Sequence, residues 1–171
     1  ERLNRLGPTR LDELVAHLAA RSTLAVLDVR PALIADKAHD GPETFHNYYP
    51  LGTHWCQRGC YVAYRAILAR LAEKRPSIVP LEPSDFEAHL EPGRGDSFRR
   101  LLYLPEGLEQ KALAFEPKVP LRAQASEATE NGVRRRWTHT EDPALPRAVV
   151  FHDSFGLGLE TVLFVPGQNA P

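Results

Sequence analysis

A serine and a histidine in distinctive local sequences are the residues of this chain best suited to chemistry. Ser154 follows the apolar, β-branched run Val149-Val150-Phe151, which predicts a buried strand bounded upstream by Pro146. A serine at the carboxyl end of such a strand lies where open α/β sheets bind their ligands. Its hydroxyl is a weak nucleophile unless a base takes its proton, and His54 is the candidate base. The pair predicts nucleophilic catalysis if the fold brings the two segments together.

The loop that holds His54 is followed by a strong helical pattern. Apolar residues recur at the spacing of one helix face, and Pro76 ends the pattern. The stripe consists of Cys60, Ala63, Tyr64, Ile67, Leu68 and Leu71. A loop just before a rigid helix can hold a catalytic group in a fixed position. The simpler alternative is a histidine at a helix start whose ring is satisfied locally.

Two further features have simpler explanations than catalysis. His152 alternates away from Ser154 along the apolar run and is expected to pack or hydrogen-bond locally, with a second base as the alternative. Gly95-Asp96-Ser97 has the letters of the nucleophile motif but follows no apolar run. It therefore favours a loop and a helix cap.

The amino-terminal third alternates helix, strand and helix. Thr9, with Asp12 three residues on, predicts a capping box and a helix. The β-branched and aliphatic run of residues 23–29 predicts a strand, and Pro31 begins a short helix that reaches about Lys37. This alternation is typical of an α/β fold.

The patterns weaken after residue 76. Residues 77–83 predict a short edge strand, and Ser84 with Glu87 predicts a helix of one or two turns. Residues 91–146 hold six prolines and are expected to form an irregular insertion that covers or flanks the site rather than a second domain. Within it, a short helix is predicted from Ser97 to Leu102 and a strand over residues 133–138.

The chain is expected to end in a helix and a tail. The helix is predicted from Ser154 to Leu163, and residues 165–171 are expected to be a flexible tail. Residues 1–171 are thus read as one α/β domain. No further strand is predicted after this helix, so we expect the sheet to be incomplete at one end or both.

Composition argues against several classes of protein. The 171 residues are 43% hydrophobic and 25% charged, with a net charge of −1, as in an ordinary globular protein. Arg134-Arg135-Arg136 is a local basic run and most simply a solvated strand face, so no nucleic-acid partner is expected. No apolar stretch approaches the ~18 residues of a membrane span.

The two cysteines and the first residue of the chain lead to two further predictions. Cys56 and Cys60 are four residues apart, which suits one helix face and not a disulfide, and they lack the further ligands of a zinc site. Buried packing is expected of both. The chain begins at Glu1 and contains no Met, which suggests an excised or processed segment of a protein that could carry a targeting or anchor sequence.

At its two motifs the chain resembles the SGNH-hydrolase-like domain of the alginate O-acetylation proteins, the AlgX/AlgJ type. In that family an Asp-x-His-Trp segment precedes a helix, and much further along a strand leads into an Asp-Ser nucleophile motif. Here Thr53-His54-Trp55 matches the first pattern and Asp153-Ser154-Phe155 matches the second. The order, base before nucleophile, also matches. The resemblance extends over residues 9–164.

The resemblance implies a fold and a set of roles. The fold is a flavodoxin-like α/β domain of the SGNH type, with a mostly parallel sheet flanked by helices. Ser154 would be the nucleophile and His54 its general base, with no metal or organic cofactor. The backbone N–H of Ser154 would donate to the oxyanion.

One departure from the family pattern bears on activity. The orienting aspartate of the family falls two residues before the histidine, where this chain has Gly52. Loss of the equivalent carboxylate in a serine-protease triad costs about 10⁴ in rate. Three interpretations stay open: a weak Ser–His dyad, another carboxylate such as Asp28 or Asp40, or lost catalysis. Asp153 is expected to shape the nucleophile turn rather than orient His54.

The functions that follow belong to different classes. The first is a carbohydrate O-acetyltransferase or acetylesterase acting on an exopolysaccharide in the periplasm or cell envelope. Its partners would be the polysaccharide, an acetyl donor and other envelope polysaccharide-modification proteins. The second is a catalytically impaired homologue that binds polysaccharide or serves as a scaffold, and the third is an α/β module unrelated to sugars. Trp55 and Tyr48-Tyr49 could stack on a sugar or pack in the core.

Overall fold

The structure is a computed structural model that describes residues 7–39, 47–92, 97–105, 111–118, 123–130, 133–140 and 147–163. Five α-helices, two 3₁₀ turns and four strands lie in these ranges. In chain order they are α1 (Arg10–Arg21), α2 (Arg30–Asp36), η1 (Lys37–His39), α3 (Gln57–Ala72), η2 (Pro83–Asp85), β1 (Phe86–Pro92), α4 (Ser97–Leu101), β2 (Lys111–Pro117), β3 (Ala123–Glu130), β4 (Val133–Thr140) and α5 (Ser154–Leu163).

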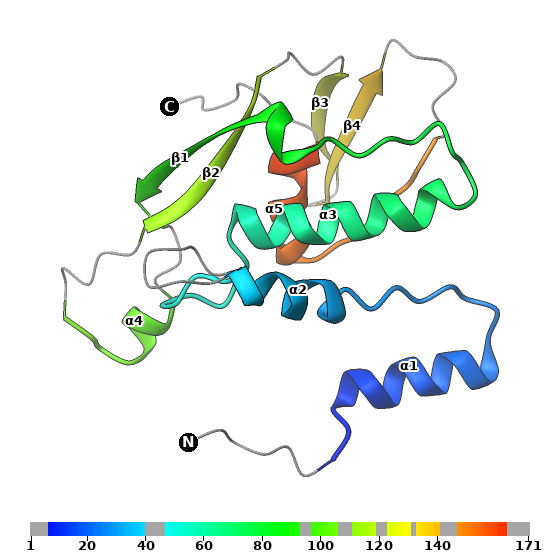
Figure 1. Cartoon of the computed structure of the whole chain (residues 1–171), viewed down its shortest axis with the longest axis horizontal. Coiled ribbons are helices and arrows are strands. Elements are labelled where there is room, and N and C mark those ends of the chain that lie inside the picture. Colours follow the sequence, from blue (N-terminus) through cyan, green and yellow to red (C-terminus); the bar gives the residue numbers. More distant parts are fainter. Residues whose placement is uncertain are drawn as a thin grey trace.

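Helix α3 is the centre of the arrangement. Figure 1 shows it between α2 on one side and the β1–β2 hairpin on the other, with α5 crossing it. The buried core gathers on α3 and on the first residue of β1, with partly buried residues of α5, β2 and the loops packed against it. Its buried members are Cys60, Tyr61, Tyr64 and Phe86.

The segment after α3 folds back onto the helix through two tyrosines. The Tyr61 hydroxyl donates to the Leu81 carbonyl oxygen at 2.9 Å, and the Tyr64 hydroxyl accepts from the Leu81 N–H at 2.9 Å. Phe86 then enters the core against Tyr61, with ring centroids 5.6 Å apart. These contacts fix where β1 begins.

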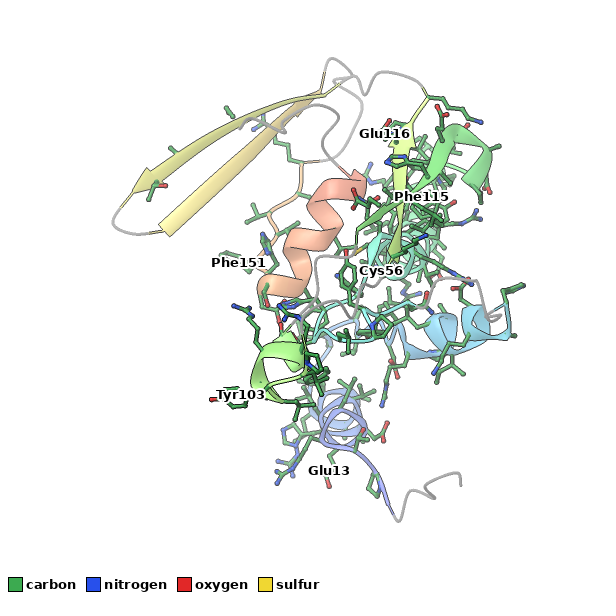
Figure 2. All side chains as sticks on the ribbon, turned by 90° about the vertical axis from the view of Figure 1, so that its left-hand side faces the viewer. Glu13, Cys56, Tyr103, Phe115, Glu116 and Phe151 are labelled. Atoms are coloured by element: carbon green, nitrogen blue, oxygen red, sulfur yellow. The ribbon has the colours of Figure 1, made fainter. Side chains whose placement is uncertain are left out.

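Both described sheets are antiparallel hairpins. Strand β1 pairs with β2, from Phe86 opposite Pro117 to Pro92 opposite Lys111, and β3 pairs with β4, from Ala123 opposite Thr140 to Glu130 opposite Val133. The β3–β4 hairpin projects away from the core (Figure 2). The parallel sheet implied by the resemblance stays a prediction, because pairing within the described residues is antiparallel only.

Several local predictions are confirmed. Thr9 and Asp12 form the predicted capping box at the start of α1. The predicted helices appear as α2, α3, α4 and α5, and the strand predicted over 133–138 lies within β4. Residues 165–171, and the side chains of Arg134-Arg135-Arg136, lie outside the described residues.

Other local predictions are wrong. Residues 23–29 and 147–151 form no strand, and Leu24 and Phe151 are 68% and 94% exposed. In Figure 2, Phe151 lies on the opposite side of α5 from Phe115. Residues 77–83 form no edge strand. The helix predicted at Ser84 is replaced by a 3₁₀ turn and β1. The region 91–146, predicted to be irregular, contains β2, β3 and β4. Short apolar runs need a partner strand, which local sequence does not supply.

A charged cluster ties the start of α1 to the start of α2. The Arg30 guanidinium bonds both oxygens of Asp28, at 2.6–3.0 Å, and reaches Asp12 Oδ1 at 2.7 Å. Hydrogen bonds from Thr9 and then from Arg30 hold the pKa of Asp12 far below its usual range, and bonds from Arg30 lower the pKa of Asp28. A carboxyl with a lowered folded-state pKa stabilises the fold above its ordinary pKa, and this contribution is lost as pH falls.

The acid dependence of stability tests this cluster. In the parent chain, the free energy of unfolding should fall as pH drops from about 5 through the ordinary carboxyl pKa of 3.8. Arg30→Met should be less stable at neutral pH and should lose less stability over this range. Urea denaturation at each pH measures both, with Arg10→Met on the exposed face of α1 as the matched control. Equal pH profiles for the parent and Arg30→Met would contradict the assignment.

Gly59 allows α3 to approach the chain just before the His54 loop. A Cβ atom at this position would lie 2.2 Å from the Asn47 carbonyl oxygen, which accepts the Cys56 N–H at 2.9 Å. That oxygen is backbone and cannot rotate away.

Substitution by alanine at two glycines tests this close approach. Gly59→Ala should lower the free energy of unfolding by about 1–3 kcal/mol, because overpacking outweighs the gain of up to ~1 kcal/mol in helix propensity. Gly7→Ala is the control, since a Cβ there would meet nothing within 4 Å. Urea denaturation compares the two, and equal stability would contradict the packing described.

Candidate active site

Ser154 and His54 lie within hydrogen-bond distance although 100 residues separate them in sequence. Ser154 Oγ is 2.8 Å from His54 Nε2. The serine is exposed and the histidine is partly buried, so a substrate has access to the pair. This is the geometry that a base requires to take the proton of a serine hydroxyl.

Phe155 joins the helix of the nucleophile to the loop of the histidine. Its carbonyl oxygen accepts the Trp55 indole N–H at 2.9 Å. Its ring lies 4.9 Å from the His54 ring and 5.5 Å from that of Trp55, measured between centroids. Because Phe155 directly follows Ser154, these contacts fix the serine relative to the imidazole.

Asp153 caps the helix that begins at Ser154. Its Oδ1 accepts the Phe155 N–H at 2.9 Å, and its carbonyl oxygen accepts the Gly156 N–H at 3.0 Å. These bonds make Asp153 the N-cap of α5 and agree with the expectation that it shapes the turn. Ser154 is the first residue of α5, and its N–H meets no acceptor among the described residues.

The His54 loop is a short turn closed by backbone pairing. Tyr48 and Trp55 form an isolated antiparallel bridge, and the Tyr49 N–H donates to the His54 carbonyl oxygen at 3.1 Å. Gly52 is buried in this turn, and its N–H donates to the Tyr49 carbonyl oxygen at 3.1 Å. Glycine at this position supplies no side chain toward the imidazole.

Neighbouring helices hold this turn in place. The buried Asn47 donates its side-chain amide to the Leu33 carbonyl oxygen of α2 at 2.9 Å. On the other side, the Phe98 N–H of α4 donates to the Leu51 carbonyl oxygen at 2.8 Å. The insertion predicted to flank the site therefore contacts the His54 loop through α4.

The second ring nitrogen of His54 faces a hydroxyl. Thr53 Oγ1 lies 3.1 Å from His54 Nδ1. Of the carboxylates suggested by sequence, Asp28 is bound to Arg30, Asp153 caps α5, and Asp40 lies outside the described residues. Thr53 was predicted only as part of the His54 motif, and its contact with Nδ1 was not predicted; the available signal was a hydroxyl residue directly before the histidine.

The other candidate residues named from the sequence make local or packing contacts and lie outside the Ser154–His54 pair. His152 Nδ1 lies 2.8 Å from the Asp153 carbonyl oxygen, and its side chain fills the space beside Gly156. Trp55 packs against the core, whereas Tyr48 is 43% exposed. Ser97 of the look-alike motif is the first residue of α4.

Cys56 and Cys60 form no disulfide within the described residues, and both are buried, as the spacing predicts. Burial raises the pKa of both Cys56 and Cys60. Cys60 packs so closely against α5 that a Cβ at Gly158 would lie 2.6 Å from its Sγ. Within the part of the chain that the structure describes, His, Cys, Asp and Glu side chains form no group of three or more that could hold a metal ion.

The chain matches no protein-family model, no curated protein and no solved structure in the three comparisons made with known proteins. In the described ranges, every helix is too short or too polar to cross a membrane.

The indole hydrogen bond can be removed while an aromatic ring is kept. Trp55→Phe deletes the N–H that reaches the Phe155 carbonyl oxygen and should lower the free energy of unfolding by about 0.5–1.5 kcal/mol. Thermal or urea denaturation measures this loss. Tyr103→Phe is the control, because it removes a polar hydrogen from a side chain that is 94% exposed, and an equal or larger loss there would contradict a special role for Trp55.

Proposed function

We propose that this chain is a serine-nucleophile O-acetyltransferase or acetylesterase of the SGNH type that acts on a polysaccharide of the cell envelope. The single observation that carries the catalytic part is the 2.8 Å separation of Ser154 Oγ and His54 Nε2. The choice of an acetylated polysaccharide rests on the resemblance of the two motifs to the alginate O-acetylation family.

The first half of the reaction forms an acyl-enzyme. His54 Nε2 takes the Ser154 proton while Oγ attacks the acetyl carbonyl carbon, which gives a tetrahedral oxyanion. The imidazolium then returns the proton to the departing alcohol oxygen as the ester bond breaks. Ser154 is left as the acetyl ester and His54 as the neutral base.

The start of α5 supports the charge that develops in this step. The Ser154 N–H is uncommitted among the described residues, and it lies at the positive end of the helix dipole. The Phe155 N–H is committed to Asp153. Ser154 is therefore the backbone donor that this turn offers to the oxyanion.

The second half of the reaction releases the acetyl group. A hydroxyl group, from a sugar for transfer or from water for hydrolysis, gives its proton to His54 Nε2 and attacks the acetyl ester. Collapse of the second tetrahedral intermediate frees Ser154. Because Ser154 is exposed, an acceptor as large as a polysaccharide chain has a route to it.

A non-catalytic role is the second candidate, and Gly52 is the observation that favours it. A carboxylate partner of the imidazole forms a charge-assisted hydrogen bond about twice as strong as a neutral one. Here the described partner of His54 Nδ1 is the neutral hydroxyl of Thr53. A chain so weakened could keep polysaccharide binding and serve as a scaffold among envelope polysaccharide-modification proteins.

Hydrolysis of p-nitrophenyl acetate tests the proposal. Ser154→Ala and His54→Gln should each lower kcat/KM by about 10²-fold, the advantage left when a serine-protease triad already lacks its carboxylate. Ser97→Ala is the matched control, because it makes the same change in the look-alike motif.

Two outcomes separate the candidates. If Ser154→Ala hydrolyses the ester as fast as the parent chain, the enzyme proposal is wrong. If the parent then binds an O-acetylated exopolysaccharide in a sedimentation assay without releasing acetate, the scaffold role is the better description.

A further inference from the structure

We propose that Thr53 is the positioning residue of His54: its hydroxyl oxygen accepts the Nδ1–H and holds the imidazole in the tautomer that can act as a base. The inference rests on the proposed function. It follows from one contact, the 3.1 Å separation of Thr53 Oγ1 and His54 Nδ1, together with the position of Ser154 on the other side of the ring.

A neutral imidazole carries one proton, and its place decides whether the ring can be a base toward Ser154. With the proton on Nδ1, Nε2 presents a lone pair to the serine hydroxyl. With the proton on Nε2, the ring donates to Ser154 Oγ and cannot accept its proton. A hydroxyl can accept or donate, so the contact with Thr53 allows both arrangements.

The start of α5 favours the reactive arrangement. Ser154 is the first residue of this helix, where the helix dipole is positive. A lone pair on Nε2 is stabilised by that potential, whereas an N–H group pointing toward it is not. The Asp153 carboxylate, which caps the same terminus through the Phe155 N–H, acts in the opposite sense and reduces the difference. The proton is therefore expected on Nδ1, with Thr53 Oγ1 as its acceptor.

The ring is also held from its face, so that this hydrogen bond keeps a constant geometry. The Phe155 ring packs against His54 at a tilt of 35°. The Tyr49 N–H holds the His54 carbonyl oxygen at 3.1 Å. Thr53 is exposed, so its side chain can be changed without disturbing the packing of the core.

Two variants of Thr53 separate positioning from a structural role. Thr53→Val is nearly isosteric and lacks the hydroxyl, and Thr53→Ser keeps the hydroxyl. We expect Thr53→Val to lower kcat/KM for p-nitrophenyl acetate about 3- to 10-fold, with the loss in kcat. We expect Thr53→Ser to restore most of the rate and both variants to keep the urea midpoint of the parent.

A measurement independent of turnover reads the tautomer directly. Long-range ¹H–¹⁵N spectra distinguish a protonated Nδ1 from a protonated Nε2, and His54→Gln identifies the signal among the seven histidines. We expect the Nδ1–H form in the parent and in Thr53→Ser, and a mixture in Thr53→Val.

Different results would overturn the positioning role of Thr53 and the proposed function. An Nε2–H form in the parent, or parent tautomer and parent rate in Thr53→Val, would overturn the positioning role. A rate unaffected by Ser154→Ala would instead overturn the proposed function, and the tautomer spectra alone would then decide whether Thr53 positions the ring.

Discussion

The hydrogen bond from the Trp55 indole to the Phe155 carbonyl oxygen is the contact on which the proposed chemistry depends. One partner follows the candidate base and the other follows the candidate nucleophile, so a single bond sets the distance between the two. The rings of His54, Trp55 and Phe155 pack around it. Gly158 lets α5 come close enough for this bond, because a Cβ atom there would lie 2.6 Å from Cys60 Sγ and 2.7 Å from Trp55 Nε1.

The catalytic strength of the Ser154–His54 pair is limited by the partner of His54 Nδ1, which is the Thr53 hydroxyl. A carboxylate both orients an imidazole and stabilises its protonated form, whereas a hydroxyl does the first and adds little to the second. The site therefore has a nucleophile, a base and a helix terminus in place, with a weak third partner. Such an arrangement suits slow turnover of a stable ester, or the retained architecture of a binding protein.

Local sequence predicted the helices because their signals are contained within each segment. The capping box at Thr9, the apolar stripe on α3 and the run after Ser154 specify helices without distant partners. The run of residues 147–151 was predicted to be a strand, but a strand needs a neighbour, and Val149 and Val150 are instead 82% and 68% exposed. The two motifs, with the base before the nucleophile as in the family they resemble, predicted that His54 and Ser154 would meet. The Thr53 contact depends on a side-chain rotamer inside a turn, which no spacing rule encodes.

The long separation of the two halves of the site also bears on how the protein is made. A ribosome adds about 5–20 residues per second, so the loop of His54 emerges roughly 5–20 s before Ser154, which lies 100 residues later. Helices α2 and α3 can dock around that loop in the interval, since Asn47, Leu33 and Cys56 are close in sequence. Helix α5 is the last element that the structure describes, so it can dock onto α3 only after the other described elements have been made. Newly made chains should therefore hold the part of the core that α3 and β1 contribute before any nucleophile lies beside the imidazole, and the nascent protein stays inert until synthesis has passed α5.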